Sequence, residues 1–314
     1  MIFSLAITGP TASGKTALSL GLAERLGAEI ISCDSMQIYR GMDIGTAKAT
    51  EAERARVPHH LIDFLSPLES YSVESYRAAA IACADDITAR GKTPLFVGGT
   101  GLYIDSLMRC PSPQVPESDP EYRNNILSGI KTDRDITDLW NRLNEVDPES
   151  AERIHKNNVK RVIRALEIYD KTGMPKSLLD RESLEAEPHL FVGMITIDFL
   201  NRELLYDRVD KRVDIMMQSG LLSEVESLYR AGFLTGGTAL QAIGYKELNP
   251  YFEGEKSLEE CIENLKMQTR RYAKRQLTWF RRDERMNFIY IDDYSCSGDM
   301  LAAVLEIIER KKKA

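Results

Sequence analysis

The sequence lacks the features that mark secreted, membrane-spanning and zinc-binding proteins. Its 5 cysteines are scattered, with no C-x-x-C pair and no zinc-type spacing, which predicts reduced thiols packed as small apolar side chains. The opening segment from Met1 to Thr8 carries no basic residue, and its apolar run is too short for a signal peptide. No stretch approaches the ~20 apolar residues that a membrane span requires. We therefore expect a cytoplasmic protein without membrane contact.

The chain also lacks an excess of positive charge. Its 41 Lys and Arg residues face 48 Asp and Glu residues, and the net charge of −7 argues against a protein that coats nucleic acid through bulk charge. The segment from Lys266 to Arg285 nevertheless holds eight basic and two acidic residues, so it carries +6 and leaves −13 elsewhere. Its arginines recur at the spacing of a long helix predicted over about 258–282, a pattern suited to phosphate contacts. A second basic group lies between Lys156 and Arg164; for both groups a solvated helix face remains the alternative.

Five short apolar runs indicate buried strands. They are Ile2–Thr8, Glu29–Cys33, Pro94–Val97, Phe191–Ile197 and Phe288–Ile291. Helical patterns separate most of these runs, which predicts an α/β fold with a parallel sheet.

A proline-rich segment between residues 110 and 120 interrupts this alternation. Its prolines cannot continue a helix, so the segment is interpreted as a linker. Helical patterns follow it at Asp119–Gly129, Ile136–Leu143 and Val159–Lys171. We therefore predict a mostly helical insertion domain at 113–190, within a core formed by 1–112 and 191–314 that ends in C-terminal basic helices.

The segment after the first predicted strand matches the phosphate-loop pattern G-x-x-x-x-G-K-[ST] in full. It consists of Gly9, Pro10, Thr11, Ala12, Ser13, Gly14, Lys15 and Thr16, and a helix is predicted from about 15 to 26. In such a loop, backbone N–H groups surround phosphate oxygens and the helix N-terminus adds positive potential. Lys15 is expected to reach the terminal phosphate, and the Thr16 hydroxyl to ligate Mg²⁺. The pattern predicts a phosphate site on a P-loop NTPase-like core.

ATP or GTP is the default ligand of such a loop, but one expected carboxylate is absent. Nucleotide hydrolases place an Asp at the end of a nearby strand to hold Mg²⁺, whereas the run Pro94–Val97 ends in Gly98-Gly99-Thr100-Gly101. Asp198 closes another predicted strand, where a turn or cap competes with a metal role. A small-molecule or nucleotide kinase stays as the alternative function.

Asp34 follows the second predicted strand, at the sheet edge where open α/β folds bind ligands. There it is placed to act as a general base or to accept a hydrogen bond from a hydroxyl group. From the residues alone, a cap of the following segment is an equally good interpretation.

Six segments together resemble the signature blocks of the bacterial tRNA dimethylallyltransferase family. They occur in family order along the whole chain, and their combination is far more specific than the phosphate loop alone. The segments are Gly9–Thr16, Asp34–Lys48, Val97–Tyr103, Asn158–Glu167, Gln241–Tyr245 and Thr269–Trp279.

The resemblance implies a Mg²⁺-dependent prenyl transfer. The dimethylallyl group of dimethylallyl diphosphate would move to N6 of adenosine 37, just 3′ of the anticodon, in tRNAs that read codons starting with U. The products would be N6-(dimethylallyl)adenosine and diphosphate. The implied partners are dimethylallyl diphosphate and the anticodon stem-loop of tRNA, with the enzyme acting as a monomer.

The resemblance also implies roles for individual residues. Asp34 would accept the proton of the exocyclic amine, with Thr100 and Lys15 as the other catalytic residues. Residues 9–16 would hold the diphosphate together with Arg208 and Arg212, and Thr16 would hold Mg²⁺. The residues implied in tRNA binding are Asp34, Ser35, Met36, Gln37, Thr100, Arg123, Lys160, Arg161, Val162, Ile163, Arg164, Gln241, Ala242, Ile243, Gly244, Tyr245, Arg270, Arg271, Lys274 and Arg275.

Overall fold

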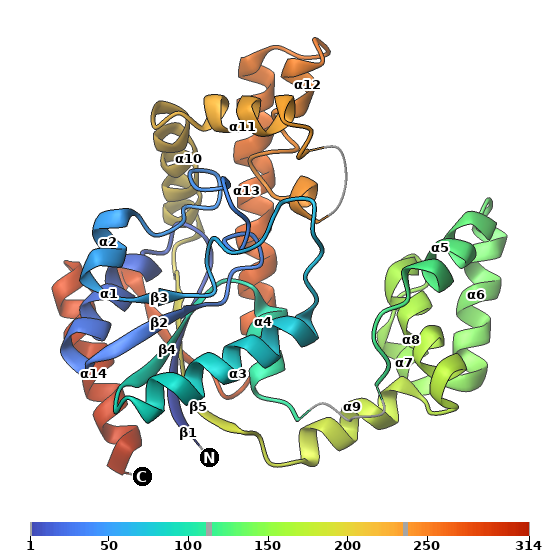
Figure 1. The fold of residues 1–314 in the computed structure, drawn as a ribbon, viewed down its shortest axis with the longest axis horizontal. Helices are drawn as coiled ribbons and strands as arrows, with labels where there is room; N and C mark the ends of the chain where they lie inside the picture. Colours follow the sequence, from blue (N-terminus) through green and yellow to red (C-terminus); the bar gives the residue numbers. More distant parts are fainter. Residues whose placement is uncertain (1, 111–114, 235–237, 314) are drawn as a thin grey trace. The chain divides into compact units, whose positions relative to one another are not determined.

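The computed structural model describes residues 2–110, 115–234 and 238–313 (Figure 1). The chain divides into two compact units, one formed by Met1–Leu107 with His189–Ala314 and the other by Met108–Pro188. The division expected from the sequence lies at 113 and 190. Pro111 and Pro113 of the predicted linker lie outside the described residues.

A parallel sheet forms the centre of the larger unit. Its described strands are β1 (Ile2–Thr8), β2 (Ala28–Ser32), β3 (His59–His60), β4 (Thr93–Gly98), β5 (Leu190–Asp198) and β6 (Asn287–Tyr290). They lie in the order β3-β2-β4-β1-β5-β6, and each neighbouring pair is parallel. The predicted α/β class is confirmed. Strand β3 has no counterpart among the predicted strands, because two residues are too short for a periodic pattern.

Helices α1 (Lys15–Leu26) and α14 (Ser297–Lys313) pack against each other beside the sheet. The first of them has the bounds that the sequence predicts. Apolar side chains of both helices, among them Leu18, Leu22 and Val304, share one buried core with β1. Burial of these side chains holds the start of α1, and with it the preceding loop, on the sheet.

The other helices of this unit are α2 (Glu51–Arg56), α3 (Val73–Ala89), α4 (Gly101–Leu107), α10 (Arg202–Gln218), α11 (Leu221–Arg230), α12 (Asn249–Phe252) and α13 (Leu258–Phe280), with short 3-10 turns at Ala239–Gln241 and Ile291–Asp293. Helix α13 begins at the predicted residue, where Ser257 and Glu260 form a capping box. Helices α10 and α13 lie side by side and share a core that includes Val209 and Ala273. No helix in the described ranges is both long and apolar enough to cross a membrane.

The carboxyl ends of the parallel strands meet at one edge of the sheet. Strand β1 has β4 and β2 on one side and β5 on the other, so the strand order reverses beside it. Open α/β sheets bind their ligands at such an edge. The segments that leave this edge are the phosphate loop after β1, Cys33 to Gln37 after β2, Gly99 to Gly101 after β4, and Phe199 after β5.

The second unit contains only helices among its described regular elements. They are α5 (Pro120–Gly129), α6 (Asp133–Val146), α7 (Pro148–Arg153), α8 (Val159–Thr172) and α9 (Lys176–Glu185). Leu143, Val162 and Leu166 are buried together at its centre. Side chains of Asp119, Thr132 and Asp147 cap the first three of these helices, which satisfies backbone N–H groups that would otherwise lack partners.

Candidate active site

The loop between β1 and α1 folds as its glycine pattern predicts. The backbone has φ of 146° at Gly9 and 84° at Gly14, a region that favours glycine. A Cβ atom on Gly9 would lie 2.7 Å from the carbonyl oxygen of Ile197, so glycine is also required for space. The Lys15 ammonium donates hydrogen bonds to the carbonyl oxygens of Gly9 (3.0 Å) and Pro10 (2.6 Å). Lys15 thus folds over its own loop.

Lys15 makes no ion pair among the described residues, although its side chain is half-buried. Desolvation and the neighbouring Arg212 guanidinium lower the pKa of Lys15 to about 7, and Asp34 opposes them. Desolvation also lowers the pKa of Arg212, again opposed by Asp34. Two neighbouring cations with little compensating charge are stabilised by an anion. The pair therefore makes the loop a favourable anion site.

Two arginines of α10 surround the loop from the other side. Arg208 and Arg212 lie one helical turn apart, so they share a face of the helix. The Arg208 Nε atom donates to the carbonyl oxygen of Ala12 at 2.9 Å, and its guanidinium lies 6.0 Å from the centre of the Phe199 ring. The structure brings both predicted arginines to the phosphate loop.

Asp34 caps its own turn and also faces the two cations. Its Oδ1 atom accepts a hydrogen bond from the Met36 N–H at 2.9 Å, so the cap interpretation is confirmed. Desolvation raises the pKa of Asp34 above its ordinary value; the turn's N–H groups, Lys15 and Arg212 act against this rise. A carboxylate with a raised pKa beside cations is an arrangement typical of catalytic bases.

Thr100 connects the end of β4 to the turn that carries Asp34. Its Oγ1 atom accepts from the Ser35 N–H at 3.1 Å, and its own N–H donates to the carbonyl oxygen of Cys33 at 3.1 Å. The Tyr272 hydroxyl of α13 interacts with the Thr100 side chain, and desolvation raises the pKa of Tyr272. Thr100 is therefore placed beside the turn that carries Asp34. Tyr272 lies within the block Thr269–Trp279, but no role of its own was predicted for it.

Gln276 of α13 joins the phosphate loop to the end of β4; it also lies within the block Thr269–Trp279, and no individual role was predicted for it. Its Oε1 atom accepts from the Thr11 N–H at 2.9 Å, and its Nε2 atom donates to the carbonyl oxygen of Gly99 at 2.9 Å. A Cβ atom on Gly99 would lie 2.1 Å from that Nε2 atom. The glycine run after β4 signals a close approach, but it does not reveal which residue approaches. Because its N–H is engaged, Thr11 offers no backbone donor to a phosphate.

The part of the site that could hold Mg²⁺ contains few oxygen ligands. No cluster of three or more His, Cys, Asp or Glu side chains suited to a metal occurs in the described ranges. Asp198 is 1 % exposed and accepts hydrogen bonds from the Arg281 guanidinium at 2.8 and 2.9 Å. Asp198 therefore has a structural role in this protein, as the partner of Arg281. Thr16 lies exposed on the first turn of α1, and its hydroxyl makes no hydrogen bond recorded for the described chain.

The predicted block Gln241–Tyr245 is largely buried. Ala242 is 2 % exposed and Tyr245 is fully buried, with its hydroxyl donating to Glu224 at 2.7 Å. These two side chains are enclosed by the protein, so the predicted contact with tRNA could involve only their main chain. Gln241 is exposed and Ile243 half-buried, whereas Gly244 is buried.

The basic residues of α13 fall into two groups. The Arg270 guanidinium pairs with both oxygens of Asp210 on α10 at 2.5 and 2.6 Å, and Lys266 pairs with Asp214 at 2.8 Å. Other side chains, those of Arg271, Lys274 and Arg275, are exposed and form no recorded ion pair in the described chain. Ion pairing within the protein thus distinguishes basic residues of α13 that look alike in the sequence.

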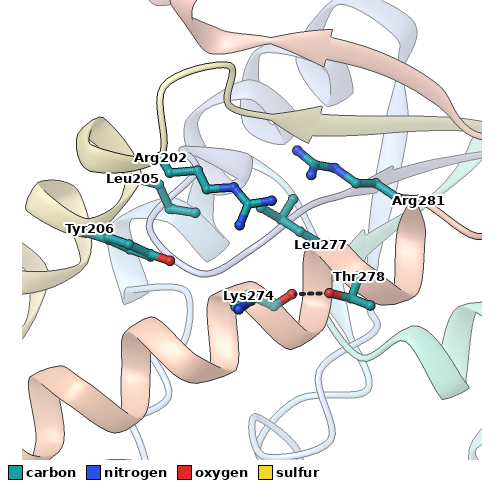
Figure 2. Close-up of a pocket in the computed structure, with 7 residues that line it drawn as sticks. All are labelled: Arg202, Leu205, Tyr206, Lys274, Leu277, Thr278 and Arg281. Carbon is teal, nitrogen blue, oxygen red and sulfur yellow. Dashed lines mark hydrogen bonds between the residues drawn. The ribbon is translucent and has the colours of Figure 1, made fainter.

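A pocket between α10 and α13 is lined by three cationic side chains (Figure 2). The lining residues are Arg202, Leu205, Tyr206, Lys274, Leu277, Thr278 and Arg281. The Thr278 hydroxyl donates to the Lys274 carbonyl oxygen at 2.9 Å, and Arg281 is held by Asp198. No residue of the phosphate loop lines this pocket, so it belongs to the basic face of α13 rather than to the anion site.

The predicted tRNA residues of the helical unit also fall into two groups, those that are buried or paired within the protein and those that are exposed. Glu167 is fully buried and accepts from the Arg123 and Arg164 guanidinium groups at 2.8 and 2.9 Å. Val162 and Ile163 are each 1 % exposed, so their side chains are not available to tRNA in this structure. Lys160 and Arg161 are exposed on the first turn of α8.

Comparison with known proteins gives consistent matches along the chain. The family model described as IPP transferase matches residues 37–283 of this chain. A second family model, described as isopentenyl transferase, matches residues 3–63. The chain is 43 % identical over 308 residues to a tRNA dimethylallyltransferase of Caldanaerobacter subterraneus subsp. tengcongensis, with 98 % of both chains covered. It is 48 % identical over 292 residues to a tRNA dimethylallyltransferase of Acetivibrio thermocellus, with 92 % of both covered.

Solved structures match the same extent of chain. A tRNA delta(2)-isopentenylpyrophosphate transferase from Staphylococcus epidermidis has a TM-score of 0.72 at 40 % identity, covering 99 % of this chain and 100 % of that one. A eukaryotic dimethylallyltransferase crystallised in its action on tRNA has a TM-score of 0.82 at 30 % identity, covering 99 % of this chain and 80 % of that one. Both likenesses extend over nearly all of this chain.

Proposed function

This chain belongs to the IPP transferase family, and on that premise we propose that it transfers the dimethylallyl group of dimethylallyl diphosphate to N6 of adenosine 37 in tRNA. The observation that carries the proposal is the position of Asp34, whose carboxylate interacts with both Lys15 and Arg212. One site therefore offers cations for a departing diphosphate and a carboxylate for a proton. The tRNAs concerned would be those that read codons starting with U.

The phosphate loop binds the diphosphate end of the substrate. Backbone N–H groups from Ala12 to Thr16 supply hydrogen bonds, and the N-terminus of α1 adds positive potential. A phosphate oxygen draws the Lys15 ammonium away from two backbone carbonyls, because a charge-assisted hydrogen bond is the stronger one. Arg212 and Arg208 neutralise the charge that develops on the leaving group.

Thr16 is the residue that would hold Mg²⁺. The ion keeps several water molecules in enzymes and takes one or two protein oxygens beside the phosphates of the substrate. One exposed hydroxyl at the start of α1 fits this preference, and a dedicated carboxylate cage is not needed. When bound, Mg²⁺ supplies charge neutralisation at the diphosphate.

Asp34 accepts the proton in the transfer step. The bond between C1 of the dimethylallyl group and the diphosphate oxygen breaks, and diphosphate leaves with the electron pair. A bond forms between C1 and N6 of the adenine, and N6 loses one proton to the Asp34 carboxylate. Because desolvation raises the pKa of Asp34, it is a stronger base than an exposed carboxylate. Thr100 holds the adjoining turn through Ser35.

The RNA partner is bound through exposed cations. The target base must leave its stack to reach the carboxylate, as in other enzymes that modify bases. Arg271, Lys274 and Arg275 on α13, and Lys160 and Arg161 on α8, are available for phosphate contacts with the anticodon stem-loop. We place the monomeric enzyme with its tRNA substrate in the cytoplasm.

A small-molecule or nucleotide kinase is the competing function for a phosphate loop. A kinase would bind ATP tightly, and it would leave the exposed cations of α13 without a task. Competition between ATP and dimethylallyl diphosphate for the protein separates the two functions, because only the kinase requires ATP as a preferred ligand.

The deciding experiment is incubation with dimethylallyl diphosphate, Mg²⁺ and unmodified tRNA, followed by mass spectrometry of the nucleosides. N6-(dimethylallyl)adenosine is the expected product, and its absence from several tRNAs with adenosine at positions 36 and 37 rejects the function. Asp34→Asn should lower kcat by about 100-fold or more, while tRNA binding persists. A variant that loses binding alone contradicts the role of Asp34 as base.

A further inference from the structure

The loop after β2, residues 40–48, is held by one carboxylate from α11. Glu224 accepts hydrogen bonds from the three consecutive backbone N–H groups of residues 43–45, at 2.8 to 3.0 Å. Its Oε1 atom also accepts from the Tyr245 hydroxyl at 2.7 Å. Four donors to one carboxylate form a strong, charge-assisted set of hydrogen bonds. Nothing in the sequence pattern assigns Glu224 a role in the site.

Tyr245 supports the same loop by close packing. The side chain is fully buried, and a Cβ atom on Gly45 would lie 2.6 Å from its ring. Only glycine therefore allows the loop to approach the tyrosine. Lys48 closes the far end of the loop, with its ammonium group on Asp43 and Asp63. Hydrogen bonds and ion pairs thus hold the loop at both ends.

This loop sets the orientation of the Gln37 amide. The Gln37 Nε2 atom donates to the carbonyl oxygens of Thr46 and Ala47, both at 3.2 Å, and its Oε1 atom accepts from the Ser32 hydroxyl at 2.9 Å. A backbone carbonyl can only accept, so the NH₂ group must face the loop. The amide oxygen retains a lone pair, and it is the group that Gln37 can offer to a ligand.

Gln37 and Asp34 belong to one turn. The backbone N–H of Gln37 donates to the Asp34 carboxylate, which is one reason that the pKa of Asp34 does not rise further. The turn thereby carries two hydrogen-bond acceptors, the carboxylate of its first residue and the amide oxygen of its fourth. The exocyclic amine of adenine carries two N–H donors, whereas guanine has a carbonyl oxygen at that position.

We propose that Glu224 and Tyr245 are positioning residues that make the site selective for adenine over guanine, an inference that rests on the proposed function. By holding loop 40–48, they keep the Gln37 amide oxygen as an acceptor for the N6 proton that is retained. Asp34 takes the N6 proton that is lost. A guanine would place its O6 atom against two acceptors, and the unpaired groups would weaken its binding.

The test compares Glu224→Gln and Tyr245→Phe with Glu226→Gln, a matched control on the same helix. The half-buried Glu226 pairs with Arg230, one turn further along that helix. The substrate is an anticodon stem-loop RNA with adenosine at the target position, and the same RNA with guanosine serves as a competitive inhibitor. Glu224→Gln should lower kcat/KM for the RNA by about tenfold or more, while KM for dimethylallyl diphosphate stays within about twofold. Glu224→Gln should also lower the preference for adenosine over guanosine. Tyr245→Phe should lower both quantities by a smaller factor.

Several results would overturn the proposal. One is a folded Glu224→Gln variant that keeps both the catalytic efficiency and the adenosine preference of the wild type. Another is a Gln37→Leu variant with undiminished adenosine preference. If neither Glu224→Gln nor Tyr245→Phe folds, by circular dichroism, the pair is purely structural. A wild type that makes no prenylated nucleoside rejects the proposed function instead, while the RNA-binding preference remains measurable.

Discussion

Two lysines close to the same sheet edge are withdrawn from solvent in opposite ways. Lys48, whose side chain is 1 % exposed, donates to the carbonyl oxygen of Tyr39 at 2.7 Å and pairs with the carboxylates of Asp43 and Asp63. Among the described residues, Lys15 donates its hydrogen bonds to two backbone carbonyls of the phosphate loop, next to the guanidinium of Arg212. The first charge is compensated inside the fold and fixes a loop. The second charge is compensated only in part, through Asp34, and a ligand anion would supply the remaining negative charge.

The same distinction applies to the basic helices. Arg270 pairs with Asp210, and Arg123 and Arg164 converge on the buried Glu167, so these charges stabilise the protein. Lys274 remains exposed without a recorded ion pair in the described ranges. Counting basic residues therefore overstates the charge available to RNA, and pairing shows which cations a substrate can use.

The largest effect is expected from Lys15. Lys15→Ala removes a cation opposite the departing diphosphate, so kcat/KM should fall by about 100- to 1,000-fold. Because burial and Arg212 disfavour its charge more than Asp34 favours it, thermal unfolding should not become easier. Steady-state kinetics with dimethylallyl diphosphate and RNA measure the first effect, and circular dichroism melting the second. A Lys15→Ala enzyme with the kcat/KM of the wild type would show that Lys15, contrary to the prediction, has no role in the reaction.

The compensated lysine should behave in the reverse manner. Lys48→Met retains the apolar stem but removes three hydrogen bonds, and it should lower the free energy of unfolding by about 2 kcal/mol. The loss is limited because Asp43 and Asp63 are partly exposed and regain water. Urea unfolding measures it. A variant as stable as the wild type would show that the pairing does not support the loop.

The pKa of Lys15 predicts a pH dependence for diphosphate binding. In the free protein this pKa is about 7, so Lys15 is neutral above that pH and must take up a proton when an anion binds. The affinity for inorganic diphosphate should fall as pH rises above 7, by up to about tenfold per pH unit. Calorimetry in buffers of different ionisation enthalpy detects the proton uptake. Lys15→Met is the control, since it keeps only the titration of diphosphate itself; equal uptake in both proteins would exclude Lys15.

The smallest effect is expected on the exposed cations. Lys274→Ala should weaken tRNA binding severalfold and reduce the slope of log affinity against log salt concentration by about 1. Lys266→Ala is the matched control, because Lys266 lies on the same helix but pairs with Asp214. Filter binding at several salt concentrations measures both. Equal slopes for the two variants would show that pairing does not decide which cations meet RNA.

Much of the site could be predicted because its signals are local. The phosphate loop and α1 depend on glycines, one lysine and a helical pattern within consecutive residues, and the structure has the helix at the predicted residues. Asp34 follows a strand that an apolar run reveals. The buried residues of the blocks at 162–163 and 242–245 were not distinguishable from their exposed neighbours, because burial depends on which helix face meets a core.

The contacts that complete the site join distant parts of the chain. Gln276 meets Gly99 across 177 positions, and Glu224 meets Asp43 across 181. No periodic pattern or motif connects residues at such separations, since local spacing determines only which residues share a helix or strand. These partners become visible only when the elements are packed together.

By itself, the sequence determined the α/β class, the phosphate loop and the carboxylate after the second strand, because backbone conformation and strand order follow from short-range chemistry. Only the tertiary structure decided which charges are compensated. It paired Lys48, Arg270 and Arg281 with acids from other segments, and it left Lys15 beside another cation. The physical reason is that a charge acquires its energy from the groups and solvent around it, and these are set by packing.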